Sequence, residues 1–465
     1  MPYQREQQYL MPPSLKEWLP EDHLAWFVLD AVEQLDLGEF YRRHREDGWG
    51  APAFAPKLMV ALLLYAYCTG CRSSRRIEQC CREDVAYRVI TANQAPGHAT
   101  IARFRQGHEA ELNRLFVQVL GLCAAAGMVR LGVVAVDGTK MAANASWDAN
   151  RTLPAIEAEV GRMLAEAEAT DAAEDREFGA DRRGDELPEE LRRRAGRLAR
   201  LQEAKASLEA RARQRQEAYE RLLAERAAEE AARGRSLRGR KPKAPDSRRD
   251  EGARANVTGP DSRLMKSAKG YLQGYNAQLV VTREQIILAA GCTSEESDHH
   301  QLHTMLGRAG ANLAAAGVYA SIDAAVAGAG YYTDANALAA HEGGPELFIA
   351  IANRHPWRRA LSEGCGPCGR IPRRLSLKER MARKLLTKRG QRLYAVRARS
   401  VEPVFGMIKY ARGASRFLRR GLEACDAEWR LLAATHNMLK LWRRFTVQRR
   451  HEPQNRGRRS LALAA

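Results

Sequence analysis

The chain of 465 residues is 45% hydrophobic and 28% charged, a composition typical of a globular protein with a sizeable core. Its 75 Lys and Arg residues outnumber its 56 Asp and Glu residues, and the net charge of +19 favours an anionic partner, nucleic acid first. The most apolar helical stretch, residues 57–67, is much shorter than the roughly 20 residues that cross a bilayer, and the first residues lack the apolar run of a signal peptide, so we expect a cytoplasmic protein without a membrane span.

Residues 14–128 carry a helical pattern throughout. Ser14 and Glu17 match the capping box that opens many helices. A second helix is expected to begin at Pro56 and to end at Gly70, because proline suits the first helical turn and glycine suits the position after the last one. We therefore predict an all-helical N-terminal region.

Two short helices, in "SSRRIEQCCRED" and "VAYRVIT", and a long helix over residues 98–127 complete this region. Basic side chains such as Arg103 and Arg105 are scattered along these helices. Short helices that are joined by tight turns and rich in arginine are typical of a helix-turn-helix DNA-binding domain. A small helical bundle with a solvated basic face has the same pattern, so both interpretations stay open.

At residue 131 the pattern changes to "LGVVAVDGTKMAANAS", a Val-rich segment that predicts a strand ending on Asp137 and Gly138. Ligand sites in open α/β sheets lie beyond the carboxyl ends of strands, which makes Asp137 a candidate for a functional carboxylate. An Asp that merely forms a turn before a glycine would look the same.

Residues 150–255 form a charged block that is rich in Ala, Glu and Arg. Leucines recur at heptad positions, but Lys205 and Arg215 interrupt the apolar seam. The pattern predicts a helical hairpin or a weak coiled coil that is inserted into the fold as a solvated appendage, with phosphate contact as a second interpretation.

Strand patterns resume after the block. Two runs joined near residues 282–285 predict a hairpin, a helix follows over 298–317, and "GVYASIDAAVAG" and "LFIAIANR" predict two more strands. Strands that alternate with helices around one long insertion indicate a mixed α/β domain. In "AVAGAGYYTDANA" the strand ends in a glycine turn, and the strand tip offers only Gly328.

A helix carrying Glu402 is expected near the C-terminus. Ser400 can cap it and Pro403 fits its first turn, which would place Glu402 near the positive end of the helix. Lys409 is seven residues further on, on the same face and roughly 10 Å along. The two side chains could bind a metal ion and a nearby phosphate, or form a solvated helix face.

Several of these segments together resemble bacterial insertion-sequence transposases of the DDE type. They are "LLLYAYCTGCRSSRRIEQ", "VVAVDGTKMAANAS", "QGYNAQLVV", "AGYYTDANA" and the stretch from "YAVRARSVEPVFGMIKYARG" to "THNMLKL". The similarity covers nearly the whole chain outside the charged block. Its most specific part is the Glu402 segment, where Tyr394, Arg397 and Lys409 fall close to the family signature, with one residue more than usual between Arg397 and Glu402.

The resemblance implies a ribonuclease H-like domain in which three acids hold two divalent ions, Mg²⁺ or Mn²⁺. Paired ions activate the attacking oxygen and stabilise the leaving oxygen of the scissile phosphodiester. Asp137 matches the first acid, Glu402 the third, and Lys409 the signature lysine. The second acid of the family stands directly before the Ala-Gly-Tyr of this strand, and here that position is Gly328.

Neither nearby Asp is expected to replace the missing acid. Asp323 is five residues upstream of Gly328, roughly 16 Å away along a strand, and Asp334 lies beyond the turn. Gly259 and Gly97 also stand where relatives usually have Asp. The repeated change suggests accumulated point mutations of one kind.

The predicted fold is α/β: a ribonuclease H-like mixed sheet with flanking helices, preceded by an all-α DNA-binding domain and interrupted by the charged insert. The predicted domains are residues 1–128 for DNA binding, 129–149 with 256–446 for catalysis, 150–255 for the insert and 447–465 for a basic flexible tail.

The implied function is binding of the terminal inverted repeats of an insertion sequence, followed by metal-dependent DNA cleavage and strand transfer that is impaired by Gly328. The alternatives are a catalytically dead DNA-binding derivative and a basic scaffold without sequence preference. A homo-oligomer on double-stranded DNA, at element ends and target, and a nucleoid location are expected. The expected DNA contacts are Tyr394, Arg397, Lys409, Arg412, Arg416, Arg103 and Arg105, with Arg419 and Arg420 adding positive charge nearby.

Overall fold

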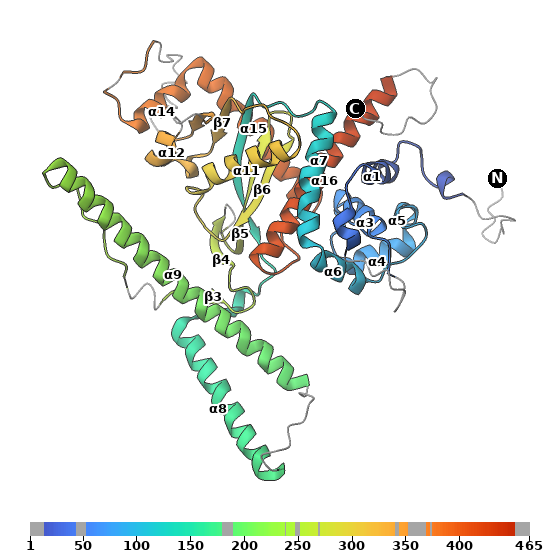
Figure 1. Ribbon diagram of the computed structural model, residues 1–465, viewed down its shortest axis with the longest axis horizontal. Coiled ribbons are helices and arrows are strands. Elements are labelled where there is room, and N and C mark those ends of the chain that lie inside the picture. Colours follow the sequence, from blue (N-terminus) through green and yellow to red (C-terminus); the bar gives the residue numbers. More distant parts are fainter. Residues whose placement is uncertain are drawn as a thin grey trace. The chain divides into compact units, whose positions relative to one another are not determined.

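The computed structural model divides the chain into two compact units (Figure 1). The core unit comprises Met1–Met141, Asn276–Arg419 and Glu423–Ala465, and the insert unit comprises Ala142–Tyr275 and Arg420–Leu422. The residues that the structure describes are 14–42, 53–178, 189–237, 239–246, 252–267, 270–339, 344–351, 369–372 and 374–451. No helix in these ranges is both long and apolar enough to span a membrane.

The N-terminal region is helical, as predicted. Its elements are η1 (Leu15–Glu17), α1 (Leu24–Glu33), α2 (Gly38–Arg42), α3 (Pro56–Cys68), α4 (Ser74–Glu83), α5 (Val85–Ile90), α6 (His98–Gly107) and α7 (Glu109–Ala125). Ser14 caps only the short η1, and α1 begins later with His23 as its N-cap. The long helix expected over 98–127 is broken at His108 into α6 and α7.

The sheet is mixed, which confirms the α/β class. Its strands are β1 (Val133–Ala142), β4 (Arg263–Ser267), β5 (Gly270–Thr282), β6 (Ile287–Thr293), β7 (Ala324–Ala327) and β8 (Glu346–Ile349). Within the described residues the order is β4-β5-β1-β7-β8, with β6 also paired to β5. The strands β1, β7 and β8 are parallel, whereas β5 and β6 form the predicted antiparallel hairpin. Contrary to prediction, β1 does not end at Asp137 but continues to Ala142.

Helices cover the sheet and connect it to the N-terminal region. They are α11 (Gln301–Ala315), α12 (Asp334–Ala339), α14 (Leu377–Leu386), α15 (Lys388–Gly406) and α16 (Leu422–His451), together with the short η3 (Ala329–Tyr331) and η4 (Met407–Ala411). The helix α16 lies between the sheet and the N-terminal helices (Figure 1). On one side Trp429 donates to the Gln278 carbonyl of β5, and on the other the Cys68 thiol of α3 donates to the Thr435 carbonyl.

The helix that carries Glu402, α15, begins earlier in the chain than predicted. It begins at Lys388, and Thr387 is its N-cap. The Thr387 hydroxyl accepts a hydrogen bond from the Gly390 amide at 3.0 Å. Ser400 therefore lies inside α15, and its hydroxyl donates to the Val396 carbonyl at 2.7 Å instead of capping a helix. At the other end of the chain α16 continues to His451, and residues 452–465 of the predicted tail lie outside the described residues.

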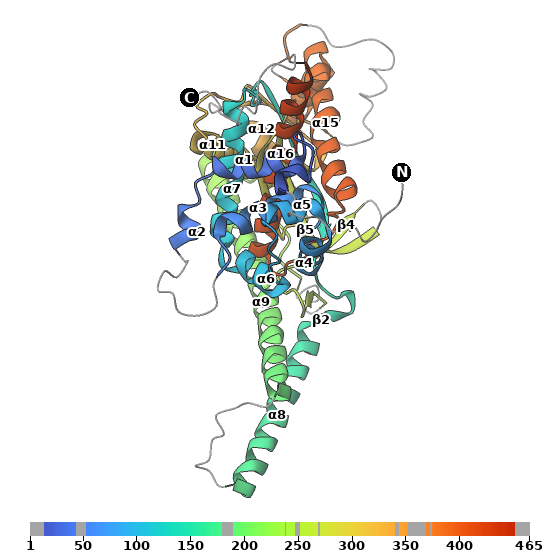
Figure 2. The same ribbon diagram turned by 90° about the vertical axis from the view of Figure 1, so that its right-hand side faces the viewer.

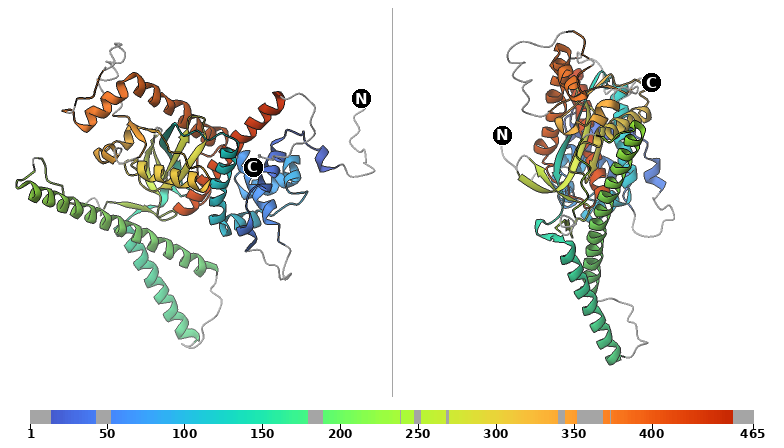
Figure 3. Two further views of the ribbon diagram at one scale, coloured as in Figure 1. Left: turned by 45° about the horizontal axis from the view of Figure 1, so that its top comes forward. Right: turned by 90° about the vertical axis from the view of Figure 1, so that its left-hand side faces the viewer.

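The insert unit contains the predicted pair of helices, α8 (Leu153–Phe178) and α9 (Glu189–Arg233). Beside them η2 (Trp147–Ala149) precedes a small antiparallel ribbon of β2 (Asn150–Thr152) and β3 (Arg254–Asn256). The helices meet at a buried cluster of Ile156, Leu201, Ala204, Leu208 and Ala255. From this cluster the two helices diverge (Figure 3).

Candidate active site

Two predicted acid positions lie side by side on neighbouring strands. In the parallel pairing of β1 with β7, Val136 is opposite Ala327, so the next residues along the two strands are Asp137 and Gly328. The backbone of Gly328 is extended, with φ −69° and ψ 170°. Any residue can adopt this conformation, so the backbone does not require glycine at this position.

The guanidinium group of Arg397, from α15, joins these positions to the third. Its Nη2 donates to Asp137 Oδ2 at 2.6 Å, and its Nη1 donates to Glu402 Oε1 at 3.0 Å. A Cβ built on Gly328 would lie 3.6 Å from the same Nη2. The structure thus brings all three predicted acid positions around one cation, although only two of them carry a carboxylate.

The expected environment of Glu402 is wrong in one respect. Because α15 begins at Lys388, Glu402 lies near the C-terminal end of the helix, away from its positive end. Lys409 lies in η4, a π-helical segment, so the α-helical spacing from Glu402 does not apply. Its Nζ instead donates to Thr139 Oγ1 at 2.9 Å and to the Lys140 carbonyl at 3.0 Å, which places the ammonium group on the strand that carries Asp137.

Burial dominates the electrostatics of the site. It raises the pKa of Asp137 to about 6, against the lowering effect of the Arg397 guanidinium. Burial lowers the pKa of Arg397, but Asp137, Tyr394 and Glu402 outweigh this effect and the pKa is raised overall. The pKa of Tyr394 is raised, mainly by burial, while its hydrogen bond with Arg397 acts in the opposite direction. Tyr394 therefore belongs to the same cluster, and its contact with the DNA backbone stays a prediction.

A polar cluster that sequence reasoning missed lies against the same strand. Asp298 Oδ1 accepts from Asn276 Nδ2 at 2.6 Å and from Gln278 Nε2 at 2.9 Å. A Cβ on Gly138 would lie 2.9 Å from this Oδ1, and a Cβ on Gly330 would lie 3.0 Å from Oδ2. The cluster explains why glycine occupies both positions. The sequence signal for this cluster is that the polar residues Asn276 and Gln278 alternate within an otherwise apolar strand.

The predicted DNA contacts in the N-terminal helices fall into two classes. Arg103, on α6, is exposed. Arg105 is half-buried, and its Nη1 donates to the Tyr67 hydroxyl at 3.1 Å and to the Arg72 carbonyl at 2.8 Å. The guanidinium of Arg105 therefore holds α6 against α3 and the start of α4, and its DNA contact stays a prediction.

Arg412 is also placed differently from its prediction. It is buried, and its guanidinium donates to Thr435 Oγ1 at 2.8 Å and to the Leu432 carbonyl at 3.1 Å. Burial lowers its pKa to about 10. A side chain enclosed in this way does not reach a DNA phosphate, whereas Arg416, four residues on, is exposed.

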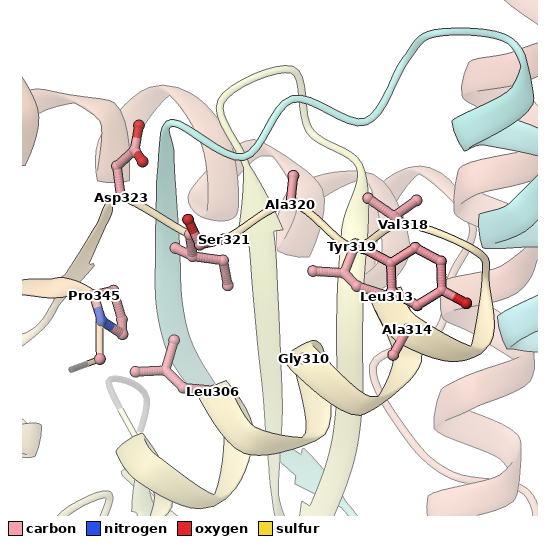
Figure 4. A pocket seen from close by; sticks show the side chains of 12 residues that line it. Leu306, Gly310, Leu313, Ala314, Val318, Tyr319, Ala320, Ser321, Asp323 and Pro345 are labelled. Carbon is pink, nitrogen blue, oxygen red and sulfur yellow. The ribbon is translucent and has the colours of Figure 1, made fainter. Parts of the chain in front are cut away.

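The two nearby Asp residues are not at the site, as expected. Asp323 directly precedes β7 and lies at the opposite end of that strand from Gly328. It lines a cavity of about 530 Å³ between α11 and the segment 318–323 (Figure 4). Asp334 is exposed at the start of α12, where its carboxylate accepts from the Tyr332 hydroxyl at 3.0 Å.

The two other unusual glycines are not required by close packing in the same way as Gly138. A Cβ on Gly97, the N-cap of α6, would meet nothing within 4 Å. Glycine has no side chain to cap the helix, and the Glu78 carboxylate instead accepts a hydrogen bond from the His98 amide at 2.9 Å. A Cβ on Gly259 would be tight, at 3.2 Å from Ser262 Oγ. A side chain at position 97 therefore has open space, whereas a side chain at position 259 requires Ser262 or Ala145 to shift.

The resemblance implies a pair of divalent ions at this site, held by three carboxylates. Within the described ranges no group of three or more His, Cys, Asp or Glu side chains is arranged to hold a metal ion. Asp137 and Glu402 converge on one guanidinium, and the third position has no ligand. The residues present do not fit the two-ion arrangement.

Two protein-family models match the chain. Residues 13–107 match a transposase domain (DUF772), and residues 370–442 match a transposase DDE domain. The first match covers η1 to α6, and the second contains Arg397, Glu402 and Lys409. No curated protein and no solved structure matches the chain. The two family matches support an insertion-sequence transposase of the DDE type.

Proposed function

We propose that this transposase binds double-stranded DNA at the terminal inverted repeats of its element and that its strand cleavage and transfer are impaired. One observation carries the proposal. The three acid positions of the family surround the Arg397 guanidinium, and the middle position is Gly328. A ligand is missing, while the surrounding fold that would present it is retained.

DDE transposases generally use divalent metal ions, which when bound activate the attacking oxygen and stabilise the leaving oxygen. We propose Mg²⁺ or Mn²⁺ as the ion and Asp137 and Glu402 as its remaining ligands. With two carboxylates instead of three, the charge of a bound dication is less compensated, so ion binding is weaker.

The other residues of the cluster would act on DNA. Lys409, beside β1, and Tyr394 would hold the DNA backbone near the cut, and Arg397 would neutralise charge at the same point. Exposed Arg103 and Arg416 would contact phosphates further away. We further propose that the protein acts as a homo-oligomer on paired ends at the bacterial nucleoid.

The proposed layout keeps the domains expected from the sequence. Residues 1–128 would bind DNA, residues 129–149 with 256–446 would form a ribonuclease H-like catalytic domain, and residues 150–255 would be an insert. Support comes from the match of the transposase domain to residues 13–107 and from the parallel pairing of β1 with β7, which aligns the first two acid positions.

The proposal is tested by strand cleavage of element-end DNA with Mg²⁺ or Mn²⁺. The natural chain, Gly328→Asp and the isosteric control Gly328→Asn are compared. We expect cleavage at the element end to rise only with Gly328→Asp and to vanish again when Asp137→Ala is added. If Gly328→Asp gains nothing and Asp137→Ala loses nothing, the site assignment is wrong.

A second candidate is a catalytically dead protein that occupies element ends and interferes with active copies. The absence of a carboxylate at Gly328 favours it. Specific cleavage by the natural chain would reject this candidate. Equal affinity for element ends and random DNA, with the same salt dependence, would reject both candidates in favour of a scaffold without sequence preference.

A further inference from the structure

The helix that carries the third acid is strongly basic. The helix α15 contains five Lys or Arg residues, and its single acidic residue is Glu402. Two of the five are already paired: Arg389 Nη2 lies 2.6 Å from Glu346 Oε2, and Arg397 binds Asp137 and Glu402. The remaining three are Lys388, Arg392 and Arg399.

These three side chains share one face of the helix. Their spacings of four and seven residues bring them within about 40° of one another around the axis, and all three are exposed. No acidic side chain in the described part of the chain forms an ion pair with any of them. We call Lys388, Arg392 and Arg399 the α15 ridge.

The ridge leads to the candidate active site. From Lys388 to Arg399 it extends about 17 Å along the axis, and exposed Glu402 lies three residues, about 5 Å, beyond its end. The helix α15 (Figure 2) packs against β7 and β8, and its opposite face carries the buried side chains of Val401 and Val404. The ridge is therefore the outward side of the element that presents Glu402.

A neighbouring turn adds charge of the same sign. Gln285, in the turn between β5 and β6, donates through Nε2 to the Arg399 carbonyl at 3.0 Å. In the same turn Arg283 is exposed, whereas one carboxylate oxygen of Glu284 is buried. The surface at the active-site end of the ridge is thus also positively charged.

We propose that the α15 ridge binds the phosphate backbone of duplex DNA and guides it along the helix to Asp137 and Glu402. Three cations on one face, without an acidic partner among the described residues, complement a polyanion whose charges recur along its axis, and about 17 Å corresponds to the rise of about five base pairs. The proposal rests on the proposed function, because it takes the element's own DNA as the ligand, but it requires binding alone and no cleavage.

The first test measures DNA affinity against salt concentration with the full chain. In the ridge variant Lys388, Arg392 and Arg399 are all replaced by Gln. The matched control replaces Arg200, Arg213 and Arg221, three exposed arginines of α9, by Gln. We expect the slope of log K against log salt to fall by about one for each ridge residue, about three in total, and to change less in the control.

The second test places a photo-crosslinker on the ridge. Ala395 is exposed between Arg392 and Arg399, so Ala395→Cys can carry the label, with Ala199→Cys on α9 as the control position and the natural chain as the background for native cysteines. We expect crosslinks to element-end DNA from position 395 above those from position 199.

Two outcomes would overturn the proposal. An equal loss of salt slope in the ridge and α9 variants would mean that only total charge matters, and crosslinking at position 395 no stronger than at 199 would place the DNA elsewhere. Both readouts are independent of cleavage. A failure of Gly328→Asp to restore cutting would therefore count against the proposed function while leaving the ridge intact.

Discussion

Replacing Gly328 by Asp should create a divalent-ion site that can be measured without any DNA. The extended backbone accepts a side chain, and the new Cβ would lie 3.6 Å or more from the Arg397 guanidinium, at ordinary van der Waals distance. The added carboxylate would be attracted by Arg397 and repelled by Asp137 and Glu402. Without metal we therefore expect a change in stability of no more than about 1 kcal/mol.

With metal the variant should differ clearly from the natural chain. An ion that binds only the folded state stabilises it by about 2.7 kcal/mol when its free concentration is 100 times the Kd. The natural chain has two carboxylates at this position and should show a higher Kd, hence a smaller gain at the same Mn²⁺ concentration. The measurement is the free energy of urea unfolding at several Mn²⁺ concentrations, with the Kd of Mn²⁺ taken separately from electron paramagnetic resonance.

The control is Gly328→Asn, which has the same shape as Gly328→Asp without the charge. We expect its response to Mn²⁺ to match that of the natural chain. The reasoning would be refuted if the Asn variant bound Mn²⁺ as tightly as the Asp variant, or if a folded Asp variant bound Mn²⁺ no better than the natural chain. Either result would mean that residue 328 does not face Asp137 and Glu402.

Two further predictions concern buried charges. Burial raises the pKa of Asp137 from 3.8 to about 6. Between pH 3.8 and about 6 the folded state therefore binds more protons than the unfolded state. The free energy of unfolding should fall by up to about 3 kcal/mol as the pH rises from about 4 to about 6. The stability of Asp137→Asn relative to the natural chain should therefore increase over this range in urea unfolding, and a constant difference would contradict the assignment. Arg72 and Glu428 form an almost fully buried ion pair at 2.7 Å, so Glu428→Gln should cost about 3–5 kcal/mol, whereas Glu33→Gln in the exposed pair with Lys57 should cost less than about 1 kcal/mol. Equal losses in the same unfolding assay would show that burial of the pair is unimportant.

The local pattern predicted β1, β5, β6, β7 and β8 and most helices, but it did not predict β4 and it misplaced the start of α15. Ser400 and Pro403 are good signals for a helix start, and the structure overrides both. Pro403 has no amide hydrogen for the carbonyl of Arg399, one turn earlier, and Gln285 supplies the missing donor at 3.0 Å. That donor is 114 residues away in sequence, so no local pattern could reveal that the helix continues through the proline.

The same limit explains the errors at the level of single residues. Arg412 follows the glutamate helix among other arginines, which favoured a phosphate contact, but a turn of the chain directs it to Thr435 inside the fold. Asp298 was missed because its partners lie on β5, about 20 residues earlier in the chain. In contrast, the alignment of Asp137 with position 328 needs only that two apolar strands run parallel. The sequence pattern predicted both strands, and the structure supplies their parallel pairing.

The glycines of the site have opposite physical meanings, and the difference bears on what this chain can still do. At Gly138 a Cβ would collide with the Asp298 cluster, so glycine is required for the strand to pack. At Gly328 the backbone is extended and a Cβ would make ordinary van der Waals contact with Arg397, so packing does not require glycine. Loss of a carboxylate there leaves the packing of β1 against β7 undisturbed. A damaged catalytic centre is therefore compatible with an intact fold and with the DNA-binding surface proposed along α15.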